Sequence, residues 1–304
     1  MTTSTGTSTS PSAGTSTSPS AGTSTGTSPS TGPSTSAGTG AEEFADLPNA
    51  PVIQRRWVTV ATGGHVGGVF WHPQKPTVVL LHDAGASARA WDDVLLALDR
   101  PAVALDLPGH GRSSRRGRGD YRPRRLAATL EEAARSFAPG GVPVVGAGFG
   151  ALAAIALKAK FPHSVGRLVL VDALPGTLSP GLRLWPTPSP EFATRDEVAA
   201  WLAERGATDA ARTAERETEQ AADGTWSWRH HLGGLPADAP TALGDETLWE
   251  QLAAVPAPLL VRTEGGPLDT VSLDRFRTQV PDGDIVTVHA EPRALADVLR
   301  PLTH

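Results

Sequence analysis

The stretch Val144–Ala153, which reads VVGAGFGALA, decides the fold of this chain of 304 residues. Its first residues are apolar, as in a buried β-strand, and its last residues are small and apolar, as in a helix. Between them, Gly146, Gly148 and Gly150 make the turn rich in glycine. The pattern predicts that a buried strand runs directly into a helix here, with Gly148 at the turn itself.

The turn resembles a nucleophile elbow, in which a strand, a G-x-S-x-G turn and a helix present a serine that attacks a carbonyl carbon. The serine position here is Gly148, which has no side chain to attack with, and the neighbouring Ala147 and Phe149 carry no nucleophile. Glycine adopts the strained backbone of such a turn easily, whereas any other residue does so at a cost of about 1–3 kcal/mol. The sequence therefore predicts a turn that keeps its shape without its reactive group.

Segments with strand-like and helix-like patterns alternate from about residue 52 onward. The predicted strands are 52–60, 66–71, 77–82, 102–106, 142–147, 167–172, 258–262 and 284–289, of which the first two form an antiparallel pair. The predicted helices are 88–98, 124–137, 150–161, 272–279 and 292–302. This alternation favours the α/β class, with a mostly parallel central sheet and helices on both faces.

The pattern changes between residues 174 and 248, and we interpret this stretch as a helical cap inserted over the sheet. Prolines and glycines dominate its first part, and two polar helices are predicted at 195–205 and 209–222. The cap also carries three tryptophans, Trp185, Trp226 and Trp228. They could line a pocket, although a small core of the cap itself is the more expected role.

Ser, Thr, Gly, Pro and Ala make up almost all of the first forty residues. Such a tract has too little apolar surface to offset its chain entropy, so we predict that it is disordered. The remaining residues, about 260, suffice for one large α/β domain. The predicted organisation is a disordered tail at 1–48, a core in two parts at 49–173 and 249–304, and the cap at 174–248.

Composition excludes several classes of function. The chain contains no cysteine, which excludes disulfides, thiolate metal sites and a cysteine nucleophile. Its net charge of −5 gives no sign of nucleic-acid binding, and its apolar runs are too short to span a membrane. Because no secretory signal is visible, we expect a cytoplasmic protein, and we predict no metal and no cofactor.

Five segments in the same chain order resemble the α/β-hydrolase fold superfamily. They are the strand ending in Leu80–His82, the aromatic Trp91, the stretch Asp106–Ser114, the elbow region and the strand Leu168–Asp172. The stretch Asp106–Ser114 reads DLPGHGRSS and is similar to the D-x-P-G-x-G-x-S stretch of that superfamily. The resemblance covers the chain from about residue 52 to its end. It implies an α/β-hydrolase fold with an inserted cap, but the fold alone does not fix the function.

The chemistry of this superfamily uses a serine, an acid and a histidine in that chain order. The resemblance implies an aspartate shortly after the strand 258–262, and the matching position is Gly266. Glu264 or Asp269 could be a displaced substitute, and so could Asp172 after an earlier strand. For all three, ordinary roles in loops, turns or helix caps are the more expected interpretation.

The histidine of this superfamily lies in a loop after the last strand. Here the strand 284–288 runs straight into His289, and a proline and the final helix follow almost at once. The usual loop is therefore shortened. His289 is either the remnant of the histidine position or only the end of the strand, and we favour the second interpretation.

The resemblance also implies an oxyanion hole formed by the backbone N–H groups of Phe149 and of the loop after His82, at Ala84. The usual H-G pair reads His82-Asp83 here. An ionised Asp83 would oppose the negative oxygen that the hole stabilises, whereas a desolvated Asp83 would stay protonated and could donate a proton. Alternatively, Asp83 points outward or caps the next helix. The expected oxyanion and pocket residues are Phe149, Ala84, His82, Trp91 and His110.

The H-D pair and the serine-less elbow are also locally similar to the NDRG-type proteins, a non-catalytic branch of the superfamily. The sequence leaves three hypotheses. The first, which the three departures at functional positions favour, is a degenerate homologue that lacks the nucleophile serine. It would bind a small apolar or carbonyl-containing molecule, or a protein partner, through the old pocket.

The second hypothesis is an enzyme that uses acid/base chemistry without a covalent intermediate, such as cyclisation, elimination or decarboxylation. Its candidate catalytic residues are Asp83 and His289, with His110 nearby. The third hypothesis is an ester or amide hydrolase with a displaced nucleophile, either Ser87 or Ser113. It ranks last because it requires a new geometry for both the base and the oxyanion hole.

Overall fold

The computed structural model describes most of the chain beyond its N-terminal tract. The described residues are 1–2, 41–47, 50–115, 120–177, 179, 181, 190–207, 209–232 and 246–303. Most of the predicted tail and the cap residue Trp185 therefore lie outside the described residues. None of the described helices is long and apolar enough to cross a membrane.

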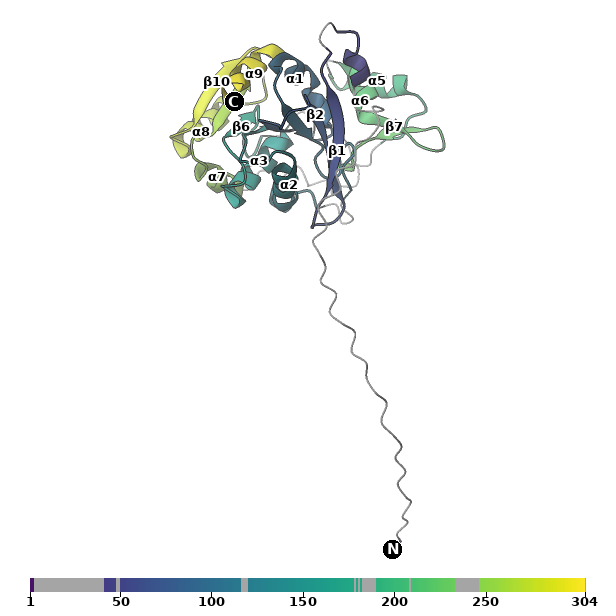
Figure 1. Cartoon of the computed structure of the whole chain (residues 1–304), viewed down its shortest axis with the longest axis horizontal. Coiled ribbons are helices and arrows are strands. Elements are labelled where there is room, and N and C mark those ends of the chain that lie inside the picture. Colours follow the sequence, from purple (N-terminus) through teal and green to yellow (C-terminus); the bar gives the residue numbers. More distant parts are fainter. Residues whose placement is uncertain are drawn as a thin grey trace.

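A single sheet organises the core (Figure 1). Its strands in the described part of the chain are β1 Ile53–Thr59, β2 His65–Trp71, β3 Val79–Leu81, β4 Ala102–Leu105, β5 Val144–Ala147, β6 Leu168–Val171, β9 Leu259–Thr263 and β10 Asp284–Val288. They lie in the order β1-β2-β4-β3-β5-β6-β9-β10. β2 runs antiparallel to β1 and to β4, and every pairing from β4 to β10 is parallel. The predicted mostly parallel sheet and its leading antiparallel pair are confirmed.

Helices cover both faces of the sheet, as predicted. One face carries η2 Ala88–Trp91, α1 Asp92–Leu98, α9 Pro292–Leu299 and η5 Arg300–Leu302. The other face carries α2 Pro123–Phe137, α3 Phe149–Lys160, α7 Glu246–Ala253 and α8 Thr270–Gln279. The fold is an α/β-hydrolase fold, with β5 and α3 at its centre.

Each strand contributes to two hydrophobic cores, one on each face of the sheet. In β3, Leu80 belongs to the core beneath α1 and α9, whereas Val79 and Leu81 belong to the core beneath α2 and α3. Val144 and Val145 of β5 divide in the same way. Successive side chains of a strand point to opposite faces, so a strand that is covered on both sides needs a continuous apolar run. This explains why the central strands lack an alternating pattern in the sequence.

The turn between β5 and α3 has the geometry that the sequence predicts. Gly148 takes φ 50° and ψ −120°, and α3 begins at the next residue. A left-handed φ of this kind strains any residue except glycine. The helix also lies very close to β3, because a Cβ added at Gly150 would stand 2.4 Å from the carbonyl oxygen of Leu81. Gly150 is therefore required by the close approach of the backbone, whereas Gly148 relieves the strain of the turn.

The cap elements form a separate small unit beside the antiparallel side of the sheet, far from β10 (Figure 1). They are α5 Arg195–Glu204, α6 Ala210–Glu217, β7 Thr218–Gln220 and β8 Trp226–Trp228. Their own core contains Phe192, Val198, Leu202, Ala214 and Trp228. Trp228 thus has the expected role in a cap core, and Trp226 packs at the edge of the same cluster.

Two details of the cap differ from the sequence prediction. The helix predicted at 209–222 ends at Glu217, because the chain turns at Gly224, whose φ is +89°, and β7 pairs with β8 as a hairpin. The predicted boundary at residue 248 falls inside α7. Leu248 and Trp249 of α7 pack into the main core rather than the cap core. The patterns were too short for the sequence to separate these elements.

Candidate functional site

The loop after β3 places Asp83 directly against the turn after β5. The two strands are parallel neighbours, so their carboxyl ends meet at the same edge of the sheet. One carboxylate oxygen of Asp83, Oδ1, accepts the backbone N–H of Phe149 at 2.7 Å and that of Ala84 at 2.7 Å. The other oxygen, Oδ2, accepts the backbone N–H of Gly181 at 2.9 Å. The carboxylate therefore occupies both donors of the expected oxyanion hole.

The same carboxylate fills the space in which a nucleophile side chain would begin. A Cβ added at Gly148 would stand 2.1 Å from Oδ1 and 2.2 Å from Cγ of Asp83. Non-bonded contacts of a Cβ atom are essentially never this short. An Asp83 in this position and a side chain at residue 148 therefore exclude each other.

Burial raises the pKa of the Asp83 carboxyl, and hydrogen bonds from Phe149, Gly181, Ser179 and Ala84 offset part of that rise. The alternative that Asp83 points outward or caps the next helix is wrong. Asp83 points inward, and the N-cap of η2 is Ser87, whose hydroxyl oxygen accepts the N–H of Arg89. Desolvation outweighs the backbone donors in its effect on the pKa, but those donors fix the inward direction of the carboxyl group.

His82 holds the loop that carries Asp83 and does not face a ligand space. Its side chain is fully buried, its Nε2 accepts the N–H of Leu107 at 2.9 Å, and its Nδ1–H donates to the carbonyl oxygen of Asp83 at 2.6 Å. Burial lowers the pKa of His82, which favours the neutral ring. His82 is thus a positioning residue of the loop.

Two other expected pocket residues belong to buried clusters instead. Trp91 lies in the core beneath α1. His110 lies among histidines, with its ring centroid 5.1 Å from that of His82 in an edge-to-face contact and 6.0 Å from that of His230. Burial lowers the pKa of His110 well below the ordinary value. Neither side chain lines the cavity that contains Asp83.

A cavity of about 310 Å³ lies between the Asp83 loop and α6 of the cap. The loop contributes Asp83 and small residues, while α6 contributes Arg212, Arg216 and Glu217. Glu217 is buried, and burial raises the pKa of its carboxyl to about 8. The hydroxyl of Ser87 donates to Glu217 Oε1 at 3.0 Å. The half-buried Asp83 and the buried Glu217 therefore share one cavity, and the hydroxyl proton of Ser87 is donated to Glu217.

The acid and histidine positions form a pair at the far edge of the sheet. His289 Nδ1 lies 2.9 Å from Glu264 Oε2, and the two side chains are 75% and 59% exposed. β10 is four strand positions from β3, which corresponds to about 19 Å at about 4.8 Å per strand. Because the loop after β10 is too short to return toward β5, the structure does not bring His289 to Asp83.

The other candidate carboxylates have structural roles. Asp172 Oδ1 accepts the N–H of Thr263 at 2.7 Å, and Asp172 Oδ2 accepts its hydroxyl at 2.6 Å. Asp269 caps α8 by accepting the N–H of Ser272. At Gly266 an added Cβ would stand 2.7 Å from Thr263 Oγ1 and 2.8 Å from Asp172 Oδ1, so these atoms leave no room for a side chain.

Ser113, the second candidate for a displaced nucleophile, is held within the core. Its Oγ donates to the carbonyl oxygen of Asp106 at 2.6 Å and accepts the N–H of Gly67 at 2.9 Å. The hydroxyl proton is therefore committed to the backbone, and no base lies beside it among these contacts.

Sequence patterns do not identify Glu217, Arg212 or Arg216 as site residues. All three lie in a polar stretch that reads as an exposed helix. The side of α6 that faces the core depends on where the cap is placed, and periodicity alone does not give that placement.

Comparisons with known proteins relate this geometry to a family. A family model described as "Alpha/beta hydrolase family" matches residues 78–298. Esterase Rv0045c of Mycobacterium tuberculosis is 33% identical over 262 residues, which cover 78% of this chain and 86% of that protein. A solved structure of the same esterase matches with a TM-score of 0.69 and 27% identity, over 86% of this chain and 94% of that chain. A thioesterase domain from the curacin biosynthetic pathway matches with a TM-score of 0.66 at 19% identity, over 83% and 99%, which supports the fold alone.

Proposed function

The chain belongs to the alpha/beta hydrolase family, and from this premise we propose that it binds a small molecule between core and cap without acting as a serine hydrolase. The observation that carries the proposal is the position of the Asp83 carboxylate. It takes the N–H groups of Phe149 and Ala84 and fills the space next to Gly148. The relative from Mycobacterium tuberculosis is named an esterase, which supports a carbonyl-containing ligand for the cavity.

Ester hydrolysis develops a negative charge on the carbonyl oxygen in the transition state. Each donor of an oxyanion hole contributes about 2.7–4 kcal/mol to the stability of the transition state. In this molecule a carboxyl oxygen of Asp83 already accepts both donors, so a developing oxyanion would have to displace it. In addition, the attacking hydroxyl is absent at Gly148, and the edge pair of His289 and Glu264 lies too far away to act as its base.

A second function is favoured by the two carboxyl groups in the cavity. Burial raises the pKa values of both Asp83 and Glu217, and that of Glu217 is about 8. A carboxyl with a pKa near neutrality can donate and accept a proton in general acid/base catalysis. The cavity therefore also suits an enzyme that moves protons on a bound carbonyl compound without a covalent intermediate.

Ester turnover by the full chain separates these functions. We expect no hydrolysis of a panel of short-chain nitrophenyl esters by the wild type above the uncatalysed rate, and none by His289→Ala, the control for the edge pair. Turnover that is lost in both Asp83→Asn and Glu217→Gln but kept in His289→Ala would support the second function. Turnover that His289→Ala abolishes would contradict both, because it would place the edge pair in a working hydrolase site.

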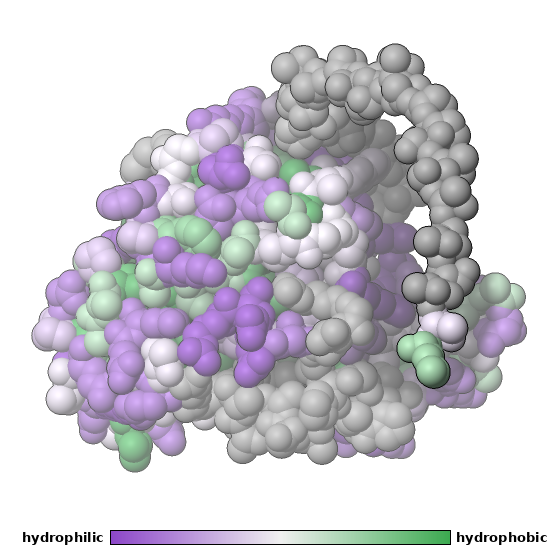
Figure 2. Space-filling view, turned by 90° about the horizontal axis from the view of Figure 1, so that it is seen from below, coloured by the Kyte–Doolittle hydropathy of each residue, from purple (hydrophilic) through white to green (hydrophobic). Residues whose placement is uncertain are grey.

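A protein partner is the other ligand class that the sequence allowed. On the face shown in Figure 2, hydrophobic residues of the described part form small patches that polar and charged residues interrupt. The described residues visible on that face therefore form no broad apolar area of the kind that marks a protein interface. We accordingly favour a small molecule in the cavity.

A further inference from the structure

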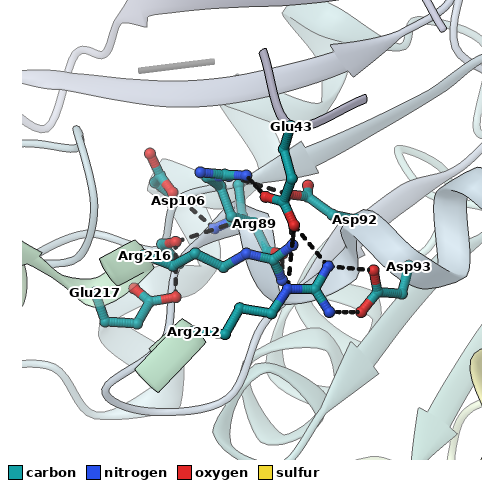
Figure 3. Close-up of polar contacts among 10 residues, drawn as sticks. Glu43, Arg89, Asp92, Asp93, Asp106, Arg212, Arg216 and Glu217 are labelled. Carbon is teal, nitrogen blue, oxygen red and sulfur yellow. Dashed lines mark hydrogen bonds and ion pairs between the residues drawn. The ribbon is translucent and has the colours of Figure 1, made fainter. Parts of the chain in front are cut away.

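Three arginines from two parts of the molecule converge on the carboxylate of Glu43 (Figure 3). Arg89 lies in η2 of the main domain, whereas Arg212 and Arg216 lie about one helical turn apart on α6 of the cap. Glu43 Oε1 accepts hydrogen bonds from Arg212 Nη2 at 2.8 Å and from Arg216 Nη2 at 2.7 Å. Glu43 Oε2 accepts one from Arg89 Nη2 at 2.5 Å. Three guanidinium groups therefore bind one carboxylate, that of Glu43.

The carboxylate comes from a peripheral segment rather than from the surrounding fold. Glu43 lies in η1, the single turn Ala41–Phe44, which precedes the sheet. This turn is attached to the core through Phe44, whose ring centroid lies 5.5 Å from that of Trp71. The Glu43 side chain is 34% exposed, so solvent and solutes reach it from outside. The segment can leave without removing any strand or helix of the core.

Two further carboxylates partly balance the arginines. Asp92 lies 3.0 Å from Arg89 Nε, and Asp93 makes a two-bond contact with Arg212 at 2.6 and 2.7 Å. Three guanidinium groups and these two carboxylates leave a single positive charge, which Glu43 neutralises. Departure of Glu43 would therefore leave a partly buried cation cluster that favours another anion.

A second observation points toward a ligand. Arg216 and Arg212 line the cavity that contains Asp83, so the arginine cluster lies at one side of that cavity. The Arg216 side chain is only 9% exposed, and its Nε is buried with no hydrogen-bond partner among the described residues. A buried donor without an acceptor is unfavourable. An oxygen atom of a ligand in the cavity would satisfy it.

We propose that Arg89, Arg212 and Arg216 form a binding site for the anionic group of a small carboxylate or phosphate ligand, and that Glu43 occupies this site as an intramolecular substitute. Guanidinium groups recognise both anions through paired N–H donors. The apolar part of the ligand extends along the cavity toward Asp83, so the inference rests on the proposed small-molecule site. Ligand binding then requires Glu43 and its turn to move out.

Thermal unfolding of the full chain with added anions tests this site. The samples are wild type, Glu43→Ala and the control Glu246→Ala, which breaks a different exposed pair with Arg275. Each is measured in sodium phosphate and in sodium chloride at equal ionic strength. We expect phosphate to stabilise Glu43→Ala in a saturable way, with an affinity at least about tenfold higher than for wild type, because an intramolecular competitor is gone. Glu246→Ala should respond like wild type.

A second pair of probes tests the link to the cavity. Hexanoate should stabilise Glu43→Ala at lower concentrations than acetate, because its apolar tail enters the cavity. If Glu43→Ala does not fold in chloride, the neutral isostere Glu43→Gln replaces it. The double variant Glu43→Ala with Arg216→Met should lose the response to phosphate.

Equal responses of Glu43→Ala and Glu246→Ala to phosphate and to hexanoate would overturn the anion site. A response to phosphate with no preference for hexanoate over acetate would overturn the connection to the cavity. Ester turnover is measured on the same samples, so a failure of the proposed function, seen as wild-type hydrolysis that needs His289, is distinguished from a failure of the anion site.

Discussion

Asp83 and Gly148 share one volume, and this fact links two departures that look independent in the sequence. The Asp83 carboxylate needs the space that a side chain at residue 148 would fill. It also needs the N–H groups of Phe149 and Ala84, which a working oxyanion hole keeps open. A serine introduced alone at residue 148 would therefore collide with Asp83, and its failure to hydrolyse esters would say nothing about the acid and the histidine.

Glu217 should make the stability of the fold depend on pH. Its pKa is about 8 in the folded protein against 4.5 as the ordinary value, so the folded state holds a proton that the unfolded chain has released. This group therefore stabilises the fold fully below about pH 4.5, and its contribution falls as the pH rises to about 8. Glu217→Gln should remove up to about 1.4 kcal/mol per pH unit of this dependence.

The measurement is urea unfolding of wild type and Glu217→Gln between pH 5 and pH 8.5. The amide keeps an acceptor for Ser87, so the two proteins should be similar at pH 5 and the variant should be the more stable at pH 8.5. The exposed Glu215 of the same helix supplies the control Glu215→Gln, which should follow wild type. Parallel pH curves for wild type and Glu217→Gln would show that Glu217 is ionised in the fold.

At the scale of elements, loop length decides which family features stay together. β9 and β10 still bring an acid and a histidine into contact, Glu264 with His289. The chain passes from His289 to α9 within three residues, so the pair remains at the edge of the sheet. The β5–α3 turn keeps its shape because glycine suits its φ. The acid–histidine pair and the turn after β5 are therefore both present, but the order of the strands keeps them apart.

The cap hairpin of β7 and β8 should stabilise the cap independently of the core. Trp228 of β8 is 3% exposed and packs at 5.9 Å from Phe192 and 5.7 Å from Trp201, measured between ring centroids. Trp228→Ala should cost about 3–5 kcal/mol in the stability of the cap. Hydrogen exchange should show faster opening of α5 and α6, with little change in α3. Equal acceleration in α3 and in the cap would mean that the cap is not a separate cooperative unit.

At the scale of the whole molecule, the sequence predicts the fold well and the site in part. The strands themselves, the elbow turn and the two-faced core follow from apolar runs and glycines, which act locally. The sequence also identifies Asp83 and Gly148 as unusual, but not that one fills the space of the other, because that contact joins residues 65 positions apart. The roles of Arg212, Arg216 and Glu217 depend on how the cap docks, and local patterns do not encode that docking.

A double-mutant cycle of unfolding free energies tests whether the Asp83 carboxylate occupies the nucleophile position. The cycle compares Gly148→Ala in the wild-type background and in Asp83→Gly. The control is Gly176→Ala, because Gly176 also has a positive φ, +89°, but an added Cβ there meets nothing within 4 Å. A positive φ is then common to both sites, and only Gly148 carries the collision with Asp83.

We predict that Gly148→Ala costs about 1–3 kcal/mol more than Gly176→Ala in the wild-type background, as expected for overpacking. In the Asp83→Gly background this excess should fall to within about 0.5 kcal/mol of zero. If Gly148→Ala has the same cost with and without the Asp83 side chain, the carboxylate does not occupy the nucleophile position, and the account of this site is wrong.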